Sequence, residues 1–414
     1  MIQSAVSLNE AKPLPDGWRW VRLGDVCGDA ETRDPTISPE TLFQYIDISG
    51  VDATTKRILS AHAILGKDAP SRARQVVKAN DILVATTRPN LNAVALVPTE
   101  LDEEICSTGF CVLRPASEID PLFIFFFVQT SDFVRLVSGE VRGMLYPAVT
   151  DSQVRAISIP LPPLSEQKRI AAKVQELMKE VEHARTACEA RLEAARALPQ
   201  AYLRQVFESA EAKKWERRRL GEMCEEVYRY PTYYSIEYVE RGIPEIRGAL
   251  IKEDGTLETD LTKYRFISKE TSEGYSRTVL REGDFVLSVR GSMGKVALVP
   301  NELDGANMTA NLIRISPNRT FVYSPFLKLV FLSTYFQNAL EELSPQTTIR
   351  TIKAPMLKSI SIVLPPLAEQ KRIAIELQAK MEEAEKLKAS IGKQLEAIKA
   401  LPQAILRKAF RGEL

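Results

Sequence analysis

The stretch that decides the fold is Leu161-Pro162-Pro163-Leu164-Ser165-Glu166-Gln167-Lys168-Arg169-Ile170-Ala171. It returns as Leu364-Pro365-Pro366-Leu367-Ala368-Glu369-Gln370-Lys371-Arg372-Ile373-Ala374, so the two copies start at residues 161 and 364, an offset of 203 residues. Further on, Ala197-Leu198-Pro199-Gln200-Ala201 returns as Ala400-Leu401-Pro402-Gln403-Ala404 at the same offset. Nothing is inserted or deleted between the two blocks, which indicates an internal duplication with a length that must be kept.

The duplication continues upstream with weaker matches. The best of these are Asp81-Ile82-Leu83 with Asp284-Phe285-Val286, and Val94-Ala95-Leu96-Val97-Pro98 with the identical Val296-Ala297-Leu298-Val299-Pro300. Between the matched segments the two halves differ. Each half therefore consists of a variable body and a nearly invariant tail.

Apolar residues in each tail recur every seven residues, which is typical of a coiled-coil helix. In the first tail one seam is Ile170, Leu177, Ala184 and Leu198, interrupted by Arg191, and the other is Val174, Val181, Cys188, Ala195 and Tyr202. In the second tail the seams are Ile373, Leu387 and Leu401, interrupted by Lys380 and Gln394, and Leu377, Ala384, Ile391, Ile398 and Ile405. We expect two long helices that pair antiparallel; the alternative is that each helix packs only on its own body.

Prolines lie near the end of each predicted helix. Pro199 and Pro402 occupy the same place in the two tails. Proline inside a helix costs about 3 kcal/mol relative to alanine. We therefore expect a break or kink at each, with a short helix resuming.

The bodies predict mixed, β-rich domains. Short strands are expected at 76–77, 82–86, 93–97, 285–289 and 295–299, because β-branched and apolar residues alternate with polar turns there. Apolar residues at spacings of three and four predict helices over 122–136 and 325–340. The fold class is therefore α+β, with two β-rich bodies joined by two long antiparallel coiled-coil helices related by a pseudo-twofold axis.

Composition limits the function classes. No run of about 18 apolar residues exists, so no membrane span is expected, and residues 1–10 lack the basic start and apolar core of a signal peptide. Five scattered cysteines favour reduced thiols in a cytoplasm. The net charge is +1, so any nucleic-acid surface must be a local patch, with further phosphate contacts left to a partner subunit.

The sequence offers little support for a catalytic, metal or cofactor site. The chain has two histidines, His62 and His183, and no Cys or His spacing of a zinc site. The stretch Arg290-Gly291-Ser292-Met293-Gly294-Lys295-Val296 lacks the first glycine and the Ser or Thr after lysine that a phosphate loop needs. We expect no catalytic residue, no metal and no cofactor.

Polar loops between predicted strands are the best candidates for contact with DNA. Arg and Lys can read guanine edges, and Asn can read adenine, through paired hydrogen bonds. One such loop carries Arg88, Asn90 and Asn92, and the equivalent loop of the second half carries Arg290, Ser292 and Lys295. The alternative is an ordinary hairpin turn with a surface arginine.

Other candidates would contact the DNA groove or its backbone. A basic side chain lies among aromatic residues at Arg229, Tyr230 and Tyr233. The alternative is that these aromatic residues form a packed cluster. Arg72, Arg74 and Arg350 could contact phosphates, which position a protein without specifying sequence.

The chain resembles the specificity subunit of a type I restriction-modification system. The two Leu-Pro-Pro-Leu-x-Glu-Gln-Lys-Arg-Ile-Ala blocks, the two Leu-Pro-Gln-Ala blocks and the final Ala409-Phe410-Arg411-Gly412-Glu413-Leu414 carry this resemblance, which covers essentially the whole chain. It implies target recognition domains over 1–160 and 211–363 and conserved helical spacer regions over 161–210 and 364–414. The family's base-reading residues lie in variable loops, so our site residues rest on chemistry alone.

The resemblance also implies the partners. They are double-stranded DNA with an asymmetric bipartite target, two modification subunits that methylate adenine N6, and two restriction subunits that form an ATP-dependent translocase and nuclease. This chain would be the non-catalytic subunit that directs them, in the cytoplasm and without a membrane. Two other classes stay open: a scaffold that bridges protein partners, and a stand-alone DNA enzyme with unfamiliar catalytic residues.

Overall fold

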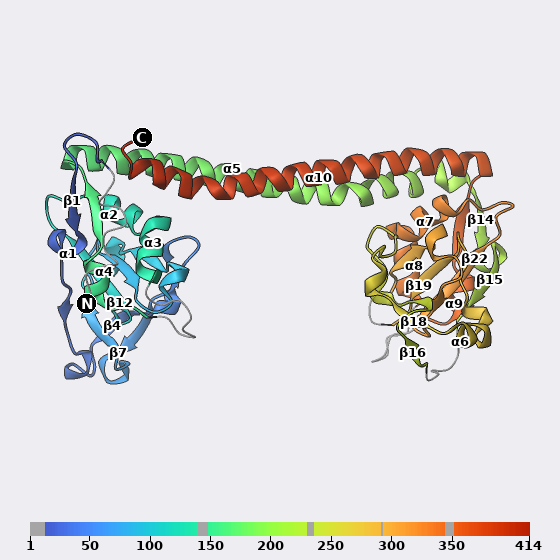
Figure 1. The fold of residues 1–414 in the computed structure, drawn as a ribbon, viewed down its shortest axis with the longest axis horizontal. Coiled ribbons are helices and arrows are strands. Elements are labelled where there is room, and N and C mark those ends of the chain that lie inside the picture. Colours follow the sequence, from blue (N-terminus) through green and yellow to red (C-terminus); the bar gives the residue numbers. More distant parts are fainter. Residues whose placement is uncertain (1–12, 140–147, 230–235, 291–292, 344–351) are drawn as a thin grey trace. The chain divides into compact units, whose positions relative to one another are not determined.

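The structure is a computed structural model that describes residues 13–139, 148–229, 236–290, 293–343 and 352–414. The chain divides into two compact units (Figure 1). Unit 1 comprises Met1–Glu189 with Lys393–Leu414, and unit 2 comprises Ala190–Gly392. Each unit therefore contains one body, the start of one long helix and the end of the other.

Each tail forms one long helix, as the heptad pattern predicts. Helix α5 spans Leu164–Phe207 and helix α10 spans Leu367–Ala409. In unit 1 the start of α5 and the end of α10 share one hydrophobic core, which includes Ile170, Val174, Leu406 and Ala409. The two helices therefore run antiparallel there, and the expectation of antiparallel pairing is confirmed. The alternative, in which each helix packs only on its own body, is wrong.

Both helices continue through their proline, so the predicted breaks at Pro199 and Pro402 are wrong. The residues that follow each proline are buried: Leu203 and Phe207 in unit 2, and Leu406 in unit 1. Full burial of one such side chain contributes about 1.5–3 kcal/mol, so Leu203 and Phe207 together offset the ~3 kcal/mol that Pro199 costs α5.

Only one of the two predicted seams in each helix is correct along its length. Val174, Cys188 and Ala195 are buried in α5, as are Leu377, Ala384 and Ile391 of the same seam in α10. The other predicted seam fails after its first residue, because Leu387 and Leu401 are each 42% exposed. Where this seam is interrupted by Arg191 and Gln394, the next residues, Leu192 and Leu395, are more buried than the residues that they follow.

Besides the β5–β6 hairpin (Val51–Asp52 and Arg57–Ile58), the described part of the unit 1 body contains three small sheets (Figure 1). A two-stranded antiparallel sheet joins β1 (Arg19–Arg22) to β13 (Ser158–Leu161), next to the start of α5. A four-stranded sheet has the order β10 (Val94–Leu96), β9 (Ile82–Ala85), β12 (Phe110–Pro115), β2 (Cys27–Gly28). A five-stranded sheet has the order β3 (Glu31–Thr32), β8 (Ala73–Val76), β11 (Ile105–Ser107), β4 (Leu42–Ile46), β7 (His62–Leu65).

Unit 2 has the same arrangement with a different insert. Its two-stranded sheet joins β14 (Glu216–Arg219) to β23 (Ser361–Leu364). Its first four-stranded sheet has the order β15 (Cys224–Tyr228), β22 (Leu312–Pro317), β19 (Phe285–Ser288), β20 (Val296–Leu298). Its second has the order β16 (Tyr238–Val239), β18 (Arg265–Ile267), β17 (Ile243–Ile246), β21 (Asn307–Met308).

We call the shared strands and helices the frame. In both units one parallel pair occurs, β11 with β4 and β21 with β17. Between β4 and β9, unit 1 has the hairpin β5 (Val51–Asp52) and β6 (Arg57–Ile58), then β7 and β8. Between β17 and β19, unit 2 instead has β18 and helix α6 (Lys269–Gly274). The frame is thus duplicated, whereas the segment inserted in it differs.

The helices predicted over 122–136 and 325–340 are each two helices. Unit 1 has α2 (Pro121–Phe127) and α3 (Ser131–Ser138), and unit 2 has α7 (Ser324–Leu332) and α8 (Thr334–Glu342). The Thr130 hydroxyl accepts a hydrogen bond from the Phe133 amide, and Ser333 does the same for Phe336. Each hydroxyl thereby starts a new helix, as N-cap residues do.

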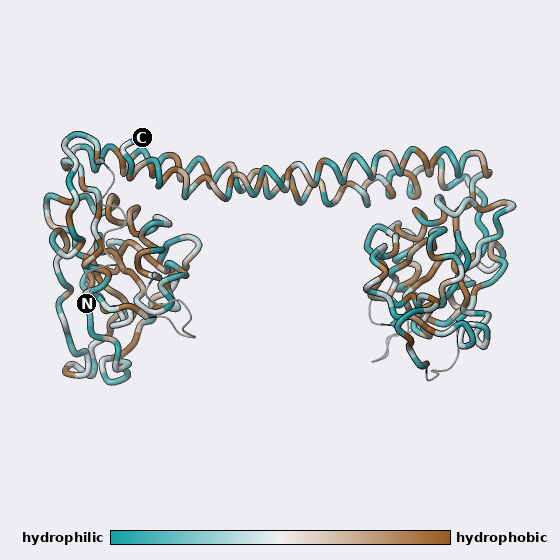
Figure 2. The backbone as a smooth tube through the Cα atoms, viewed as in Figure 1, coloured by the Kyte–Doolittle hydropathy of each residue, from teal (hydrophilic) through white to brown (hydrophobic). Residues whose placement is uncertain are grey.

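The remaining frame helices are short: α1 (Leu23–Val26) and α4 (Asp151–Arg155) in unit 1, and α9 (Ala354–Ser359) in unit 2. Brown, hydrophobic segments concentrate inside each body (Figure 2). Within the described ranges no single helix is long and apolar enough to cross a membrane; α2 and α3 pass that test only together, across a bend of 64°. Phe123 and Phe127 of α2 are buried in the unit 1 core.

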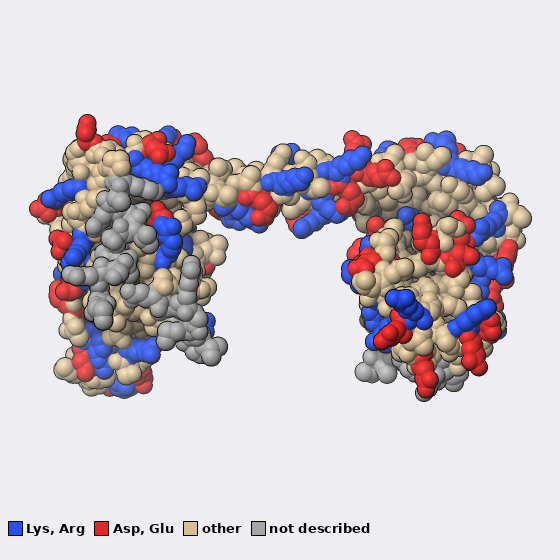
Figure 3. All heavy atoms as spheres, viewed as in Figure 1, with Lys and Arg blue, Asp and Glu red and all other residues tan. Residues whose placement is uncertain are grey.

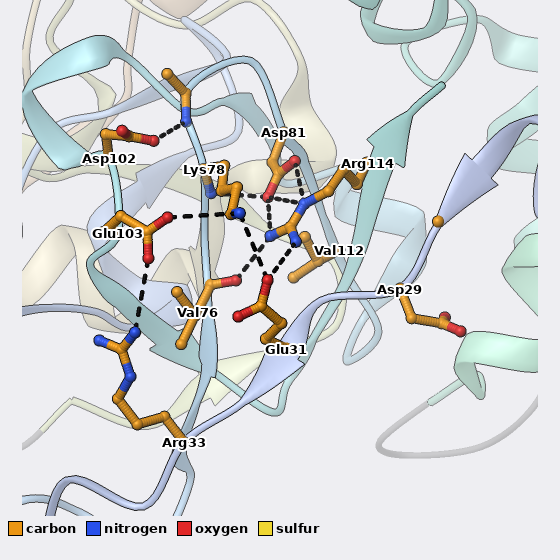
Figure 4. Close-up of polar contacts among 12 residues, drawn as sticks. Asp29, Glu31, Arg33, Val76, Lys78, Asp81, Asp102, Glu103, Val112 and Arg114 are labelled. Atoms are coloured by element: carbon orange, nitrogen blue, oxygen red, sulfur yellow. Dashed lines mark hydrogen bonds and ion pairs between the residues drawn. The ribbon is translucent and has the colours of Figure 1, made fainter. Parts of the chain in front are cut away.

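An ion pair to a buried aspartate occurs at the same place in both frames. In unit 1, Arg114 Nη2 lies 2.9 Å from Asp81 Oδ2 and also donates to the Val76 carbonyl (Figure 4). In unit 2, Arg314 Nε lies 2.8 Å from Asp284 Oδ2. Each carboxylate also accepts a backbone N–H three residues earlier in its turn. The pair therefore ties the turn before β9 or β19 to strand β12 or β22.

We expect Asp284→Ala to lower the free energy of unfolding of unit 2 by about 3 kcal/mol, because the buried Arg314 then keeps only its longer ion pair, with Nη1 3.7 Å from Glu226 Oε2. Urea unfolding of the full chain, followed by circular dichroism, measures this change. Glu369→Ala is the matched control, since it removes the exposed ion pair Glu369–Arg372, and exposed pairs contribute little. A loss no larger than that of the control would contradict the role of Asp284.

Candidate nucleic-acid interface

The loop between β9 and β10, residues 88–92, is a compact turn. A 3-10 helix, Pro89–Leu91, fills it, and the flanking Arg88 and Asn92 have φ of 50° and 49°. This left-handed conformation is uncommon for residues other than glycine. It persists where the surrounding structure holds it, so the loop has one defined shape.

Three hydrogen bonds of Asn92 anchor this loop. Lys56 Nζ donates to the Asn92 carbonyl at 2.6 Å and to Asn92 Oδ1 at 2.8 Å. Asn92 Nδ2 donates to the Val128 carbonyl at the end of α2, also at 2.8 Å. Burial lowers the pKa of Lys56 to about 8. Both polar groups of the Asn92 side chain thus hold the loop between the β5–β6 turn and α2.

Three other residues of the loop face solvent, whereas Pro89 is buried. Arg88 and Asn90 are exposed, and Leu91 is 53% exposed. A guanidinium, an amide and an apolar side chain are therefore presented together on a loop of defined shape. This combination matches the hydrogen-bonding and methyl groups at base edges in a major groove.

Arg72 lies directly before β8, and Arg74 lies within it. Arg72 is exposed. Arg74 is half-buried; its Nη1 donates to the Ala73 carbonyl at 2.8 Å and its Nη2 lies 3.6 Å from Asp34 Oδ1. The guanidinium of Arg74 therefore already has partners within the chain, unlike a side chain extended toward a phosphate.

In unit 2, Arg290 follows β19 at the position equivalent to the 88–92 loop and is exposed. Lys295, which precedes β20, forms an ion pair with Glu253 at 2.6 Å. The predicted site residues Ser292, Tyr230, Tyr233 and Arg350 lie outside the described residues.

Arg229 follows β15 and lies close to Arg290. Its Nη1 donates to the Ile352 carbonyl at 3.0 Å and its Nε to the Ala310 carbonyl at 3.5 Å. Burial, and then the positive charge of Arg290, lower the pKa of Arg229. Two arginines are thus brought together from different strands, one half-buried and one exposed, which makes this end of the sheet locally positive.

Elsewhere the charge is mixed. On the face drawn in Figure 3, Lys and Arg side chains are interspersed with Asp and Glu over each unit. Among the residues with a described placement, no group of three His, Cys, Asp or Glu could hold a metal ion. The loop cations of the two units are therefore the best local candidates for contact with a polyanion.

Comparison with known proteins identifies the family. The model of the type I restriction modification DNA specificity domain matches the chain twice, over residues 15–188 and 212–397. The chain belongs to this family. The two matches correspond to the two copies of the duplication, each with its body and most of its tail.

Solved structures resemble the chain over nearly its whole length. The HsdS subunit from Thermoanaerobacter tengcongensis is 36% identical with a TM-score of 0.72, covering 98% of this chain and 99% of that one. A chain from the structure described as "Structural basis underlying complex assembly and conformational transition of the type I R-M system" is also 36% identical, with a TM-score of 0.81 and coverage of 97% and 100%.

A curated relative is more distant. The specificity subunit of the type I restriction enzyme EcoBI from Escherichia coli is 25% identical over 315 residues. That alignment covers 70% of this chain and 65% of the relative. The chain thus spans slightly less than two thirds of that subunit's length.

Sequence reasoning selected Asn92 for its base-reading chemistry and missed Lys56. Lys56 lies 36 residues before Asn92 in the chain, in the segment that differs between the two halves. No local pattern pairs such residues, so only the folded structure reveals the anchor.

We expect Lys56→Met to raise the hydrogen-exchange rate of the Leu91 and Asn92 amides at least tenfold. A hydrogen bond from a charged donor contributes about 1.5–3 kcal/mol, and 1.4 kcal/mol corresponds to tenfold. Exchange followed by mass spectrometry on the full chain measures it. Lys67→Met, at an exposed lysine paired with Glu40, should leave these amides unchanged; equal exchange in both variants would show that Lys56 does not anchor the loop.

Proposed function

We propose that this chain recognises an asymmetric bipartite DNA target and directs the modification and restriction subunits of a type I restriction-modification complex to it. The observation that carries the proposal is a frame repeated in two units while the inserted segments and the loops after β9 and β19 differ. Two domains with the same fold but different surfaces suit the recognition of two different half-sites. Membership of the specificity-domain family supports the same assignment.

Base recognition would come from the loops on the frame. Arg88 and Asn90 would read one half-site, and Arg290 the other, through hydrogen bonds to guanine and adenine edges. Arg72 would contact a phosphate and so fix the position of the body on the duplex. Asn92 would act indirectly, since its amide holds the loop. The four candidates outside the described residues, Tyr230, Tyr233, Ser292 and Arg350, stay part of the proposal on their chemistry.

The partners of the chain are DNA and the modification and restriction subunits. We infer two copies of each subunit, because the duplicated chain offers two equivalent bodies and two equivalent helical regions. The division into target recognition domains over 1–160 and 211–363 and helical spacer regions over 161–210 and 364–414 is part of the same proposal. Methylation and cleavage would belong to the partners.

Exchange of residues 1–160 for those of a relative should change one half-site of the target and leave the other unchanged, because each body would recognise its half-site independently of the other body. Sequencing of methylated adenines in cells that express the hybrid with its modification subunit measures this. A change in both half-sites, or in neither, would contradict modular reading. Absence of any sequence-specific methylation with the wild-type chain would favour a protein scaffold instead.

Arg88→Ala and Arg290→Ala should each relax base preference in one half-site, with a loss of about 1–3 kcal/mol of discrimination for a lost paired contact. Competition binding of the chain with its modification subunit, at one stated salt concentration, measures the loss. Arg277→Ala serves as control, because Arg277 is an exposed arginine paired with Glu226. A uniform loss of affinity across all sequences would instead assign Arg88 or Arg290 to phosphate contacts.

A further inference from the structure

In unit 1, helix α2 is held at both ends by glutamines from the two long helices. At its start, Gln167 Oε1 of α5 accepts the Asp120 N–H at 2.9 Å, while Gln167 Nε2 donates to the Pro162 carbonyl at 2.9 Å. At its end, Gln403 of α10 accepts the Ser131 N–H at 2.9 Å and donates to the Gln129 carbonyl at 2.9 Å. Each amide thus uses both its donor and its acceptor on main-chain groups.

Unit 2 repeats this arrangement on helix α7. Gln370 Oε1 of α10 accepts the Tyr323 N–H at 2.8 Å, and its Nε2 donates to the Phe321 and Pro365 carbonyls at 2.9 Å each. At the other end, Gln200 of α5 donates to the Leu332 carbonyl at 3.0 Å. We call Gln167 with Gln403, and Gln370 with Gln200, the glutamine clamps.

The clamps explain why these glutamines recur in both sequence blocks. The first block supplies the buried glutamine, which is 2% exposed at Gln167 and fully buried at Gln370. It fixes the start of a long helix on the body of its own repeat. The second block supplies an exposed glutamine, which fixes the end of the long helix that comes from the other repeat.

Apolar packing near the clamps does not by itself set the angle between a long helix and a body. Phe410 packs against Phe123 and Phe127 of α2, with ring centroids 4.9 and 5.4 Å apart, and Phe207 packs against Phe326 of α7 at 5.7 Å. Such contacts tolerate rotation and sliding, because the hydrophobic effect is not directional. Hydrogen bonds weaken steeply away from their preferred angles, so the two bonds of Gln403 and the one bond of Gln200 fix the angle between helix and body.

We propose that Gln200 and Gln403 are positioning residues for target recognition. Each fixes the angle at which a long helix meets the body that it reaches, and thereby sets the spacing and phase of the two half-sites that one chain can read together. This inference rests on the proposed function. Gln200 and Gln403 would touch no DNA themselves; they would act through the orientation of the bodies.

The test uses the full chain expressed with its modification subunit. The wild-type target is first determined from methylated adenines in these cells, and duplexes are then made with the natural number of base pairs between the half-sites, one fewer and one more. Methylation rates on the three duplexes give a spacer selectivity. We expect Gln403→Met, which keeps the side-chain length but loses two hydrogen bonds, to reduce this selectivity about tenfold. Gln200→Met loses one hydrogen bond and should reduce it about threefold.

Two further variants make the comparison specific. Gln403→Glu keeps the acceptor for the Ser131 amide and loses the donor to the Gln129 carbonyl, so its selectivity should lie between those of wild type and Gln403→Met. Gln394→Met changes an exposed glutamine on the same helix and should behave as wild type. Base preference within each half-site should stay unchanged in all four variants.

The outcomes separate the clamp from the proposed function. A wild-type chain without sequence-specific methylation would overturn the proposed function itself. The clamp would be overturned if the wild-type chain methylates a specific sequence and both Met variants keep the wild-type spacer selectivity. An equal loss of rate on all three duplexes, with a lowered thermal unfolding midpoint, would assign the glutamines a structural role only and would overturn the clamp as well.

Discussion

The rest of the structure depends on the burial of helix ends in the body cores. In unit 2, Leu203 and Phe207 at the end of α5 share one core with Ile373 and Leu377 at the start of α10. In unit 1, the start of α5 and the end of α10 share a core in the same way. Neither body completes its core with its own repeat alone. The two tails must therefore keep one common length, because each has to start in one core and end in the other.

This constraint accounts for the unequal divergence of the two halves. Residues of the tails contact both the partner helix and a body, so a single insertion would turn the following side chains by about 100° around the helix axis. The frame is similarly constrained by its strand ladders and by the ion pairs Asp81–Arg114 and Asp284–Arg314. The segments after β4 and β17 hold different elements, β5 to β8 in unit 1 and β18 with α6 in unit 2, and so present different surfaces.

A rigid frame with anchored loops also explains how recognition can be specific on a chain with a net charge of +1. The 88–92 loop is held by Lys56 and by the end of α2, so its exposed side chains need not be ordered on binding. In the proposed recognition, less conformational entropy would then be lost when the loop meets a base edge. Overall attraction to phosphate could then stay weak and be supplied by the proposed partner subunits.

The sequence by itself determined the duplication, the two long helices, the frame strands β9, β10, β19 and β20, and the absence of recognisable catalytic motifs. These follow from patterns within a few residues and from identity between the two copies, which a linear reading can detect. The tertiary structure decided which predicted seam positions are buried: Leu387 and Leu401 follow Ile373 at heptad spacing but are each 42% exposed. It also decided that the helices pass through Pro199 and Pro402, and that Asn92 holds a loop while Gln403 holds a helix. Burial and hydrogen-bond partners come from residues far apart in the chain, and no local pattern specifies them.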